Sequence, residues 1–168
     1  GVLRGERTLE SINKTHIVLI PKKKAPDKFR NFRPISLCNV VYKLVSKVLA
    51  NRLKVFLGDI ISNNQSAFTP GKSITDNILI AFELFHHIKS TNNSEGYMTI
   101  KLDMAKAYDR VEWAFLERVL ITMNFDQSWI DRVMKCVTSV FFSVLINGAP
   151  TREFKPTRGI RQGYPLTP

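Results

Sequence analysis

An Asn-Gly pair at positions 147 and 148 lies between two segments rich in β-branched and aromatic residues, 140–146 and 151–155. Asn-Gly readily adopts the two positive φ angles of a type I′ turn, whose twist matches that of paired antiparallel strands. The pair therefore predicts a β-hairpin joining these two segments. Any fold for this chain must accommodate antiparallel sheet near its C-terminal end.

Four other segments carry the spacing of amphipathic helices, at about 39–57, 75–89, 112–123 and 128–138. In the first segment, Gly58 is a helix stop, and the apolar side chains that share one face are Val41, Leu44, Val45, Val48, Leu49, Leu53 and Phe56. In the second segment, the corresponding face holds Ile78, Leu79, Phe82, Phe85 and Ile88.

Further extended segments lie between these helices. Residues 16–20 form a β-rich run that stops at Pro21, and Pro34 favours extended backbone in the residue before it. Residues 97–103 alternate, which predicts a strand with a buried face (Met98, Ile100, Leu102) and a polar face (Thr99, Lys101, Asp103). Helices and strands mixed in this order, with an antiparallel hairpin, predict an α+β fold.

The charge of the chain is concentrated in its first third. Residues 1–58 hold 13 Lys and Arg against 3 Asp and Glu, whereas residues 59–168 hold 12 against 11. Such a basic segment attracts phosphate-bearing partners, which favours binding of nucleic acid or nucleotides over a role in solubility alone. An anionic membrane is a weaker alternative because the cations do not share one helical face. No apolar run approaches the ~20 residues that span a bilayer, so we expect no membrane partner.

The two cysteines, Cys38 and Cys136, are far apart and outside any metal-ligand spacing. They predict buried thiols and not a disulfide framework or a zinc site.

Asp103 is the first candidate for chemistry, because it lies at the end of the predicted strand 97–103 on its polar face. A carboxylate held there can reach a divalent metal ion. The alternative is that Asp103 caps the helix that follows, a common role for Asp. The local pattern alone favours the cap.

Two further motifs change this balance: Asn31-Phe32-Arg33-Pro34-Ile35-Ser36-Leu37 and Gly159-Ile160-Arg161-Gln162-Gly163-Tyr164-Pro165-Leu166. With them the chain resembles the reverse transcriptase family, in particular the non-LTR (LINE-like) retrotransposon branch common in plant genomes. The stretches that match, in the family's order, are His16–Pro21, Asn31–Leu53, Gln65–Asn77, Lys101–Trp113 and Arg158–Pro168.

The resemblance implies the fingers and a partial palm of a right-hand polymerase, at about 1–95 and 96–168. In the family, a strand–turn–strand with two adjacent aspartates and then a thumb follow downstream. This sequence stops before both, so the resemblance implies an incomplete active site that is inactive alone.

Individual residues take roles from the same resemblance. Asp103 matches the first metal-binding aspartate of the palm, which binds Mg²⁺. Tyr108 matches the aromatic residue that packs under the incoming sugar and rejects a ribose 2′-hydroxyl, although ordinary core packing is the alternative from the residue alone. Arg33 matches the fingers arginine that contacts the triphosphate, where a planar guanidinium suits phosphate oxygens.

The nucleotide-binding residues implied in the turns are Lys22, Lys23, Lys24, Gln162 and Gly163. The three lysines lie in the lysine-bearing turn of the fingers, and which of them reaches the nucleotide stays open. Gln162 borders nucleotide and template, and Gly163 permits close approach of the backbone. Tyr164 stands where the family usually has Asp, which indicates a degenerate copy of the element.

The function implied is RNA-directed DNA polymerase activity of a retrotransposon. Its partners would be an RNA template, a DNA primer and deoxynucleoside triphosphates. The protein would act inside the cell, in the nucleus if it copies RNA at its target site. Two alternatives stay open: a non-catalytic remnant that binds nucleic acid, and an intron-encoded maturase with the same polymerase signature. The oligomeric state is not encoded in any of these motifs.

Overall fold

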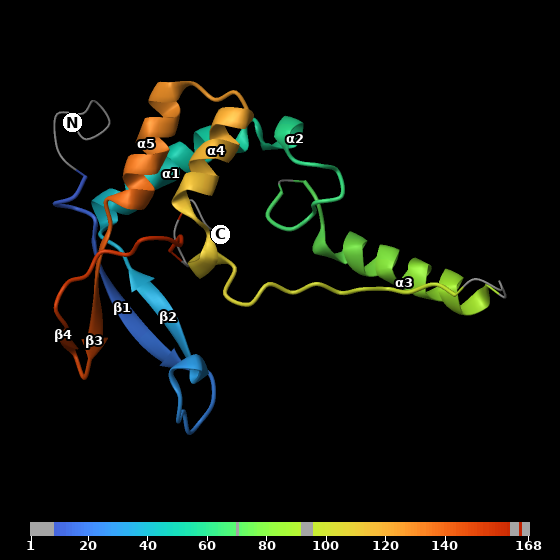
Figure 1. Ribbon diagram of the computed structural model, residues 1–168, viewed down its shortest axis with the longest axis horizontal. Helices are drawn as coiled ribbons and strands as arrows, with labels where there is room; N and C mark the ends of the chain where they lie inside the picture. Colours follow the sequence, from blue (N-terminus) through green and yellow to red (C-terminus); the bar gives the residue numbers. More distant parts are fainter. Residues whose placement is uncertain (1–8, 70, 92–95, 162–164, 166–168) are drawn as a thin grey trace. The chain divides into compact units, whose positions relative to one another are not determined.

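A computed structural model describes residues 9–69, 71–91, 96–161 and 165 (Figure 1). The chain divides into two units, residues 1–52 together with 106–168, and residues 53–105. The elements of the first unit are β1 (Lys14–Pro21), the 3-10 helix η2 (Phe29–Asn31), β2 (Phe32–Leu37), α1 (Val40–Lys54), the 3-10 helix η3 (Tyr108–Arg110), α4 (Trp113–Thr122), α5 (Gln127–Thr138), β3 (Phe141–Ile146) and β4 (Ala149–Pro150). The last two residues of α1 belong to the second unit.

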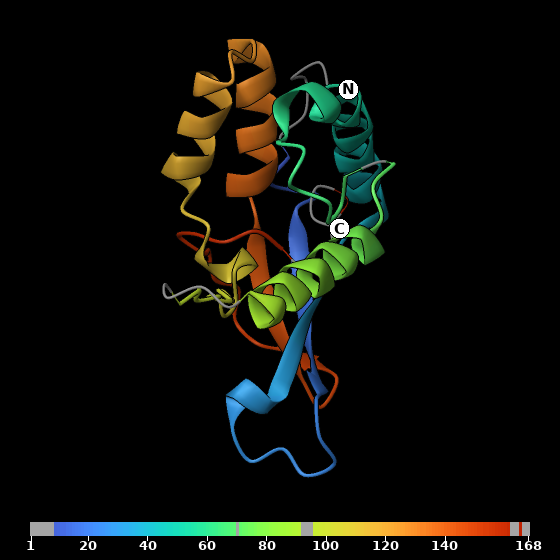
Figure 2. The same ribbon diagram turned by 90° about the vertical axis from the view of Figure 1, so that its right-hand side faces the viewer.

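The sheet of the first unit has the strand order β2-β1-β3-β4. β1 pairs antiparallel with β2, so that Ile17 stands opposite Ser36, and parallel with β3, so that His16 stands opposite Ser143. The mixed sheet and its helices confirm the α+β class. Figures 1 and 2 show β1 and β2 continuing past β3 and β4 as a long hairpin, whose tip is formed by residues 22–31.

The predicted hairpin at Asn147-Gly148 is confirmed, with φ angles of 50° and 84° at the two residues. Its second strand is shorter than predicted: β4 has two residues, and beyond it Phe142 and Phe154 form an isolated bridge. The reason lies at Thr151, whose side-chain hydroxyl, at 3.0 Å, accepts the hydrogen bond that the Val144 N–H would give to a backbone carbonyl in a regular ladder.

Two clusters of buried side chains hold the helices together, and α5 contributes to both. Between α1 and α5 the buried residues are Cys38, Tyr42, Val45, Leu49 and Cys136. Between α4 and α5 they are Leu120, Ile130 and Val133. Cys38 and Cys136 are buried free thiols, as predicted.

The buried face of α1 differs from the predicted one. Val41, Leu44 and Val48 are 49%, 63% and 38% exposed, while Tyr42 is fully buried. Tyr42 fixes this orientation because its hydroxyl donates a hydrogen bond to the Cys136 carbonyl of α5. The apolar stripe alone did not reveal this partner.

The second unit contains α2 (Leu57–Ile60) and α3 (Ile74–Ser90). The hydroxyl of Ser73 caps α3 by accepting from the Thr75 N–H at 3.2 Å. The loop before the cap is closed on itself, because Lys72 Nζ donates to the Asn63 carbonyl at 3.0 Å. The predicted helix is thus confirmed, but its apolar face is exposed, with Ile78 at 51% and Phe82 at 68%.

The predicted strand 97–103 is wrong for this structure. Residues 96–104 have no regular secondary structure, and Met98, Ile100 and Leu102 are 80%, 66% and 89% exposed. A strand is stable only when a neighbouring strand pairs with it, and no described segment does so here. Within the described part of the chain, none of the helices is long and apolar enough to cross a membrane.

Candidate nucleotide and nucleic-acid site

The tip of the β1–β2 hairpin carries the three candidate lysines in three different environments. Lys23 Nζ lies 2.6 Å from Asp27 Oδ1, and Lys22 Nζ donates to the Arg30 carbonyl at 3.3 Å. Lys24 is exposed and makes no hydrogen bond or ion pair with any residue that the structure describes. Among the three, Lys24 is thus the one whose ammonium has no partner in the described part of the chain.

Asp27 is the carboxylate that organises this tip. The ammonium of Lys23 is the main cause that lowers the pKa of Asp27, and the backbone N–H of Asp27 and the amide of Asn31 act in the same direction. Asn31 Nδ2 donates to Asp27 Oδ1 at 2.5 Å, and the Lys22 N–H donates to the Asn31 carbonyl at 2.8 Å. The tip is therefore ordered by its own polar contacts.

Arg33 follows the tip in β2, opposite Ile20 of β1. Pro34 and Ser36 are two positions apart in β2, so their side chains share one face of the hairpin, and both line a cavity there. Since Arg33 precedes Pro34 by one residue, its side chain points to the opposite face from that of Pro34. It is exposed, and no described carboxylate pairs with it.

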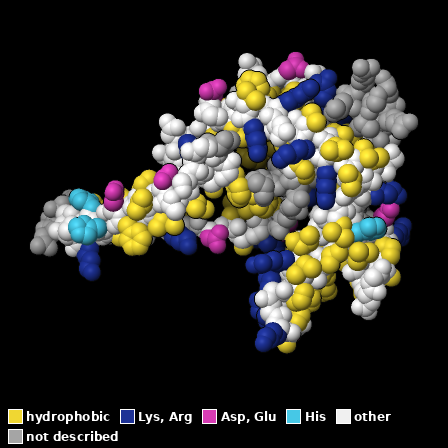
Figure 3. Space-filling model, turned by 180° about the vertical axis from the view of Figure 1, so that it is seen from behind, with side chains coloured by type: hydrophobic (Ala, Val, Ile, Leu, Met, Phe, Trp, Pro, Cys, Tyr) yellow, Lys and Arg dark blue, Asp and Glu magenta, His cyan; other side chains and the backbone are white. Residues whose placement is uncertain are grey.

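Most cations of the basic first third have no carboxylate partner in the described residues. The exceptions are Lys14, paired with Glu153 at 2.8 Å, and Lys23. Those without such a partner are Lys22, Lys24, Lys28, Arg30, Arg33, Lys43, Lys47, Arg52 and Lys54. Figure 3 shows several Lys and Arg side chains, in dark blue, along the hairpin. A surface of uncompensated cations of this kind suits a polyanion.

The stretch 158–161 docks onto the stretch 108–113. The Gly159 N–H donates to the Val111 carbonyl and the Ile160 N–H to the Tyr108 carbonyl, both at 2.8 Å. Trp113 Nε1 donates to the Gly159 carbonyl at 2.9 Å, and Arg158 pairs with Glu112 at 3.3 Å. Two motifs that are 46 residues apart in the chain are thereby held side by side.

Arg161 lies at the inner end of this stretch and was not singled out from the sequence. It is 6% exposed, its Nη1 donates to Thr15 Oγ1 at 2.9 Å, and its guanidinium carbon stands 4.4 Å from the centre of the Tyr42 ring. Stacking on an aromatic face and a side-chain hydrogen bond make this buried cation tolerable. Nothing in the local sequence distinguishes Arg161 from an exposed arginine, because its partners come from β1 and α1.

Cys136 lies close to this cation. Burial raises the pKa of its thiol to about 11, while the charge of Arg161 and the hydroxyl of Tyr42 act in the opposite direction. The thiol is therefore protonated at neutral pH and is not a nucleophile.

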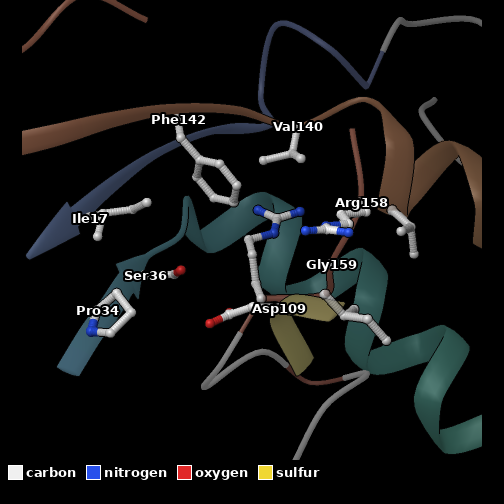
Figure 4. A pocket seen from close by; sticks show the side chains of 11 residues that line it. Ile17, Pro34, Ser36, Asp109, Val140, Phe142, Arg158 and Gly159 are labelled. Carbon is white, nitrogen blue, oxygen red and sulfur yellow. The ribbon is translucent and has the colours of Figure 1, made fainter. Parts of the chain in front are cut away.

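A cavity of about 160 Å³ lies between the hairpin and the docked stretch. Figure 4 shows Ile17, Pro34 and Ser36 on one side of it and Asp109 and Gly159 on the other. Tyr108, the neighbour of Asp109, is half-buried in η3. Arg33, Tyr108 and the three lysines thus all belong to the first unit.

Asp103 belongs to the second unit and is exposed in a segment without regular structure. The alternative that it caps the following helix is wrong: η3 begins after Ala107, and the N-cap residue of α4 is Glu112. Its carboxylate makes no hydrogen bond or ion pair with a described residue.

A single free carboxylate suits one position in the coordination shell of a hard cation such as Mg²⁺. The described residues hold no group of three or more His, Cys, Asp or Glu side chains that could bind a metal together. Gln162, Gly163 and Tyr164 lie outside the described residues.

Comparison with known proteins adds independent information. A family model described as reverse transcriptase (RNA-dependent DNA polymerase) matches residues 20–168. The transposon TX1 uncharacterized 149 kDa protein of Xenopus laevis is 34% identical over 164 residues, which is 98% of this chain and 12% of that protein.

The Pol polyprotein from the type-2 retrotransposable element R2DM of Drosophila melanogaster is 28% identical over 158 residues, 94% of this chain and 15% of that protein. The Pol polyprotein from the type-1 retrotransposable element R2 of Nasonia vitripennis is 27% identical over 157 residues, 90% of this chain and 14% of that protein. The chain spans only a small part of the length of these relatives.

Proposed function

Since the chain belongs to the reverse transcriptase (RNA-dependent DNA polymerase) family, we propose that it forms the fingers and part of the palm of an RNA-directed DNA polymerase of a non-LTR retrotransposon. Its similarity to the TX1 and R2 proteins supports the retrotransposon assignment. In this proposal the fingers cover about residues 1–95 and the palm begins at about residue 96. The observation that carries it is the docking of the stretch 158–161 onto 108–113, because two motifs of the family meet there.

The nucleotide would be held by residues of the first unit. Lys24 and Arg33 are exposed cations that pair with no carboxylate among the described residues, and they would bind the triphosphate by charge-assisted hydrogen bonds. Tyr108 is held by the Ile160 N–H through its backbone carbonyl, which leaves its ring to pack under the incoming sugar. Gln162 and Gly163 follow the docked stretch directly in sequence and would border nucleotide and template.

Asp103 would supply one carboxylate ligand for Mg²⁺. Magnesium ions bound there would neutralise the charge on the phosphates and polarise the primer 3′-hydroxyl. The remaining carboxylate ligands would come from a part of the protein outside the described residues. The chain by itself would then be inactive.

A second candidate function is binding of nucleic acid without catalysis. Nine cations of the first third pair with no carboxylate that the structure describes, and they support this function because they attract a polyanion whether or not a metal site exists. Tyr164, in the place of the family's usual Asp, points in the same direction.

Primer extension by the intact protein separates these two functions. The assay uses an RNA template annealed to a DNA primer, deoxynucleoside triphosphates and Mg²⁺, with a heat-inactivated sample as control. A polymerase extends the primer, and a remnant binds the hybrid without extending it. A protein that binds the hybrid and adds no nucleotide would overturn the polymerase proposal in favour of the remnant.

A further inference from the structure

Phe29 is an aromatic side chain that no part of the proposed site uses. It is 88% exposed at the tip of the β1–β2 hairpin, in η2. It is the one large apolar side chain between residues 22 and 31, where the other residues are Lys, Asp, Asn, Arg, Ala and Pro. Seven of the nine other residues of the tip are polar or charged, and Phe29 carries its one aromatic ring.

The backbone around Phe29 is ordered without help from its ring. The Asn31 N–H donates to the Lys28 carbonyl at 2.8 Å, and the Phe32 N–H donates to the Phe29 carbonyl. The Lys22 N–H closes the hairpin on the Asn31 carbonyl at 2.8 Å. The ring is thus presented to solvent on a fixed turn, so it makes no evident contribution to the stability of the tip.

The charge around the ring is strongly positive. The tip carries Lys22, Lys23, Lys24, Lys28 and Arg30 against one carboxylate, Asp27, which is already paired with Lys23. Lys28 and Arg30 flank Phe29 directly, and neither pairs with a carboxylate in the described part of the chain. An aromatic ring between uncompensated cations is the combination with which proteins bind single-stranded nucleic acid, because bases stack on the ring and phosphates meet the cations.

We propose that Phe29 is a stacking platform for an unpaired base of a single-stranded nucleic acid whose phosphates are bound by Lys28 and Arg30. This inference deepens the proposed function by adding a contact to its template partner. An unpaired strand suits the site because duplex bases hide their faces from a side chain. A lipid surface suits it less, since one isolated ring buries little apolar area in a bilayer interface.

The test compares Phe29→Ala, Phe29→Leu and Phe29→Trp in the whole chain, by fluorescence anisotropy with a labelled oligo-dT strand. A control strand of equal length carries the same phosphates on abasic sugars. Loss of stacking should weaken binding of Phe29→Ala to oligo-dT by about 5- to 150-fold, with no change on the abasic strand. Phe29→Leu should behave as Phe29→Ala, because a leucine keeps apolar area but has no ring, and Phe29→Trp should retain affinity.

A matched variant, Lys28→Ala, separates charge from stacking. It should weaken binding to both strands and reduce the slope of log K against log salt by about 0.7, whereas Phe29→Ala should leave that slope unchanged. Thermal unfolding of each variant should match the parent, because both side chains are exposed.

Equal affinity of Phe29→Ala and the parent for oligo-dT would overturn the proposal, as would an equal loss on the abasic strand. Binding to phosphatidylserine vesicles that depends on Phe29, with unchanged oligo-dT affinity, would overturn it in favour of a lipid surface. None of these measurements requires nucleotide incorporation. If the intact protein does not extend a primer but its affinity for oligo-dT depends on Phe29, the polymerase proposal fails and this inference stands. If the protein extends a primer but its affinity does not depend on Phe29, only this inference fails.

Discussion

Gly159 lies against the backbone of Asp109: a Cβ atom on Gly159 would stand 3.0 Å from the Asp109 carbonyl oxygen and 3.2 Å from its Cα. Gly159 also has a backbone φ angle of 89°, which residues other than glycine rarely adopt. Both features belong to the docking of the stretch 158–161, in which the N–H groups of Gly159 and Ile160 donate to the carbonyls of Val111 and Tyr108 at 2.8 Å.

Gly159→Ala should therefore destabilise the first unit by about 2–5 kcal/mol, the sum of a strained φ and a contact with backbone that cannot move aside. Gly148→Ala is the matched control, since Gly148 has a φ angle of 84° but nothing within 4 Å of its Cβ position. It should cost only about 1–2 kcal/mol. Urea unfolding of both variants measures the difference, and equal losses would show that the contact with Asp109 does not matter.

Cys136 predicts a pH dependence. Its thiol pKa is about 11 in the folded chain against an ordinary value of 9.0, and burial is the main cause. A raised thiol pKa contributes stability that is fully present below about pH 9 and is lost as the pH rises through about 11. The loss should be on the order of 2 kcal/mol.

The free energy of unfolding, measured from about pH 8 to 11, should fall more steeply for the parent than for Cys136→Ala, which has no thiol at this position. In a Cys38→Ala background, iodoacetamide at about pH 8 should modify Cys136 only after denaturation. Rapid modification of the folded chain would contradict the raised pKa.

Lys24 and Arg33 predict an effect on nucleotide binding in the intact protein. Lys24→Ala and Arg33→Ala should each raise KM for deoxynucleoside triphosphates about tenfold, the loss of one hydrogen bond to a charged group. Arg152→Ala is the matched control, because Arg152 is also exposed and its side chain has no partner in the described residues. Steady-state kinetics should show an unchanged KM for that control, and an equal rise in all three variants would contradict specific binding.

Features of this fold that depend on adjacent residues were predictable from the sequence. Asn147 and Gly148 form the expected turn because their φ angles are a local property, and α3 begins at its cap, Ser73, for the same reason. The buried face of α1 was not predictable, because it depends on a hydrogen bond from Tyr42 to α5.

The same contrast holds within the candidate site. Arg33 and the lysines lie in and between the extended segments that Pro21 and Pro34 indicated, although the pairing of these segments as a hairpin was not predicted. Arg161 escaped notice because Thr15 and Tyr42, its partners, are distant in the chain. The prediction of a strand at 97–103 failed because alternating apolar residues indicate which side chains share a face but not which strand pairs with the segment. A stable strand requires both.

The chain alone should not extend a primer on a poly-rA/oligo-dT template with Mg²⁺. Asp103 is one carboxylate, and the described residues provide no cluster that could share two like-charged ions with it. A scintillation assay of dTTP incorporation, compared with a vector-only preparation, measures this. Incorporation above that control which disappears in Asp103→Ala would show that the site is complete.

Asp103→Asn tests the assignment of the active site in the intact protein. Asn keeps the shape of the side chain but removes the negative charge that a metal ion requires. Because Asp103 is exposed and neither caps a helix nor makes an ion pair in the described residues, stability should change by less than about 0.5 kcal/mol. Primer extension should fall on the order of a thousandfold, since the carboxylate would act on the transition state through the bound ion.

Asp59→Asn is the matched control for this change: Asp59 is also exposed, lies in the same unit and loses the same charge. It should extend primers at the parental rate. Both variants lose one negative charge, so a difference between their rates of primer extension must come from the position of the carboxylate and not from the net charge. If Asp103→Asn unfolds at the parental temperature and extends primers as fast as Asp59→Asn, then Asp103 binds no catalytic metal and the palm assignment is wrong.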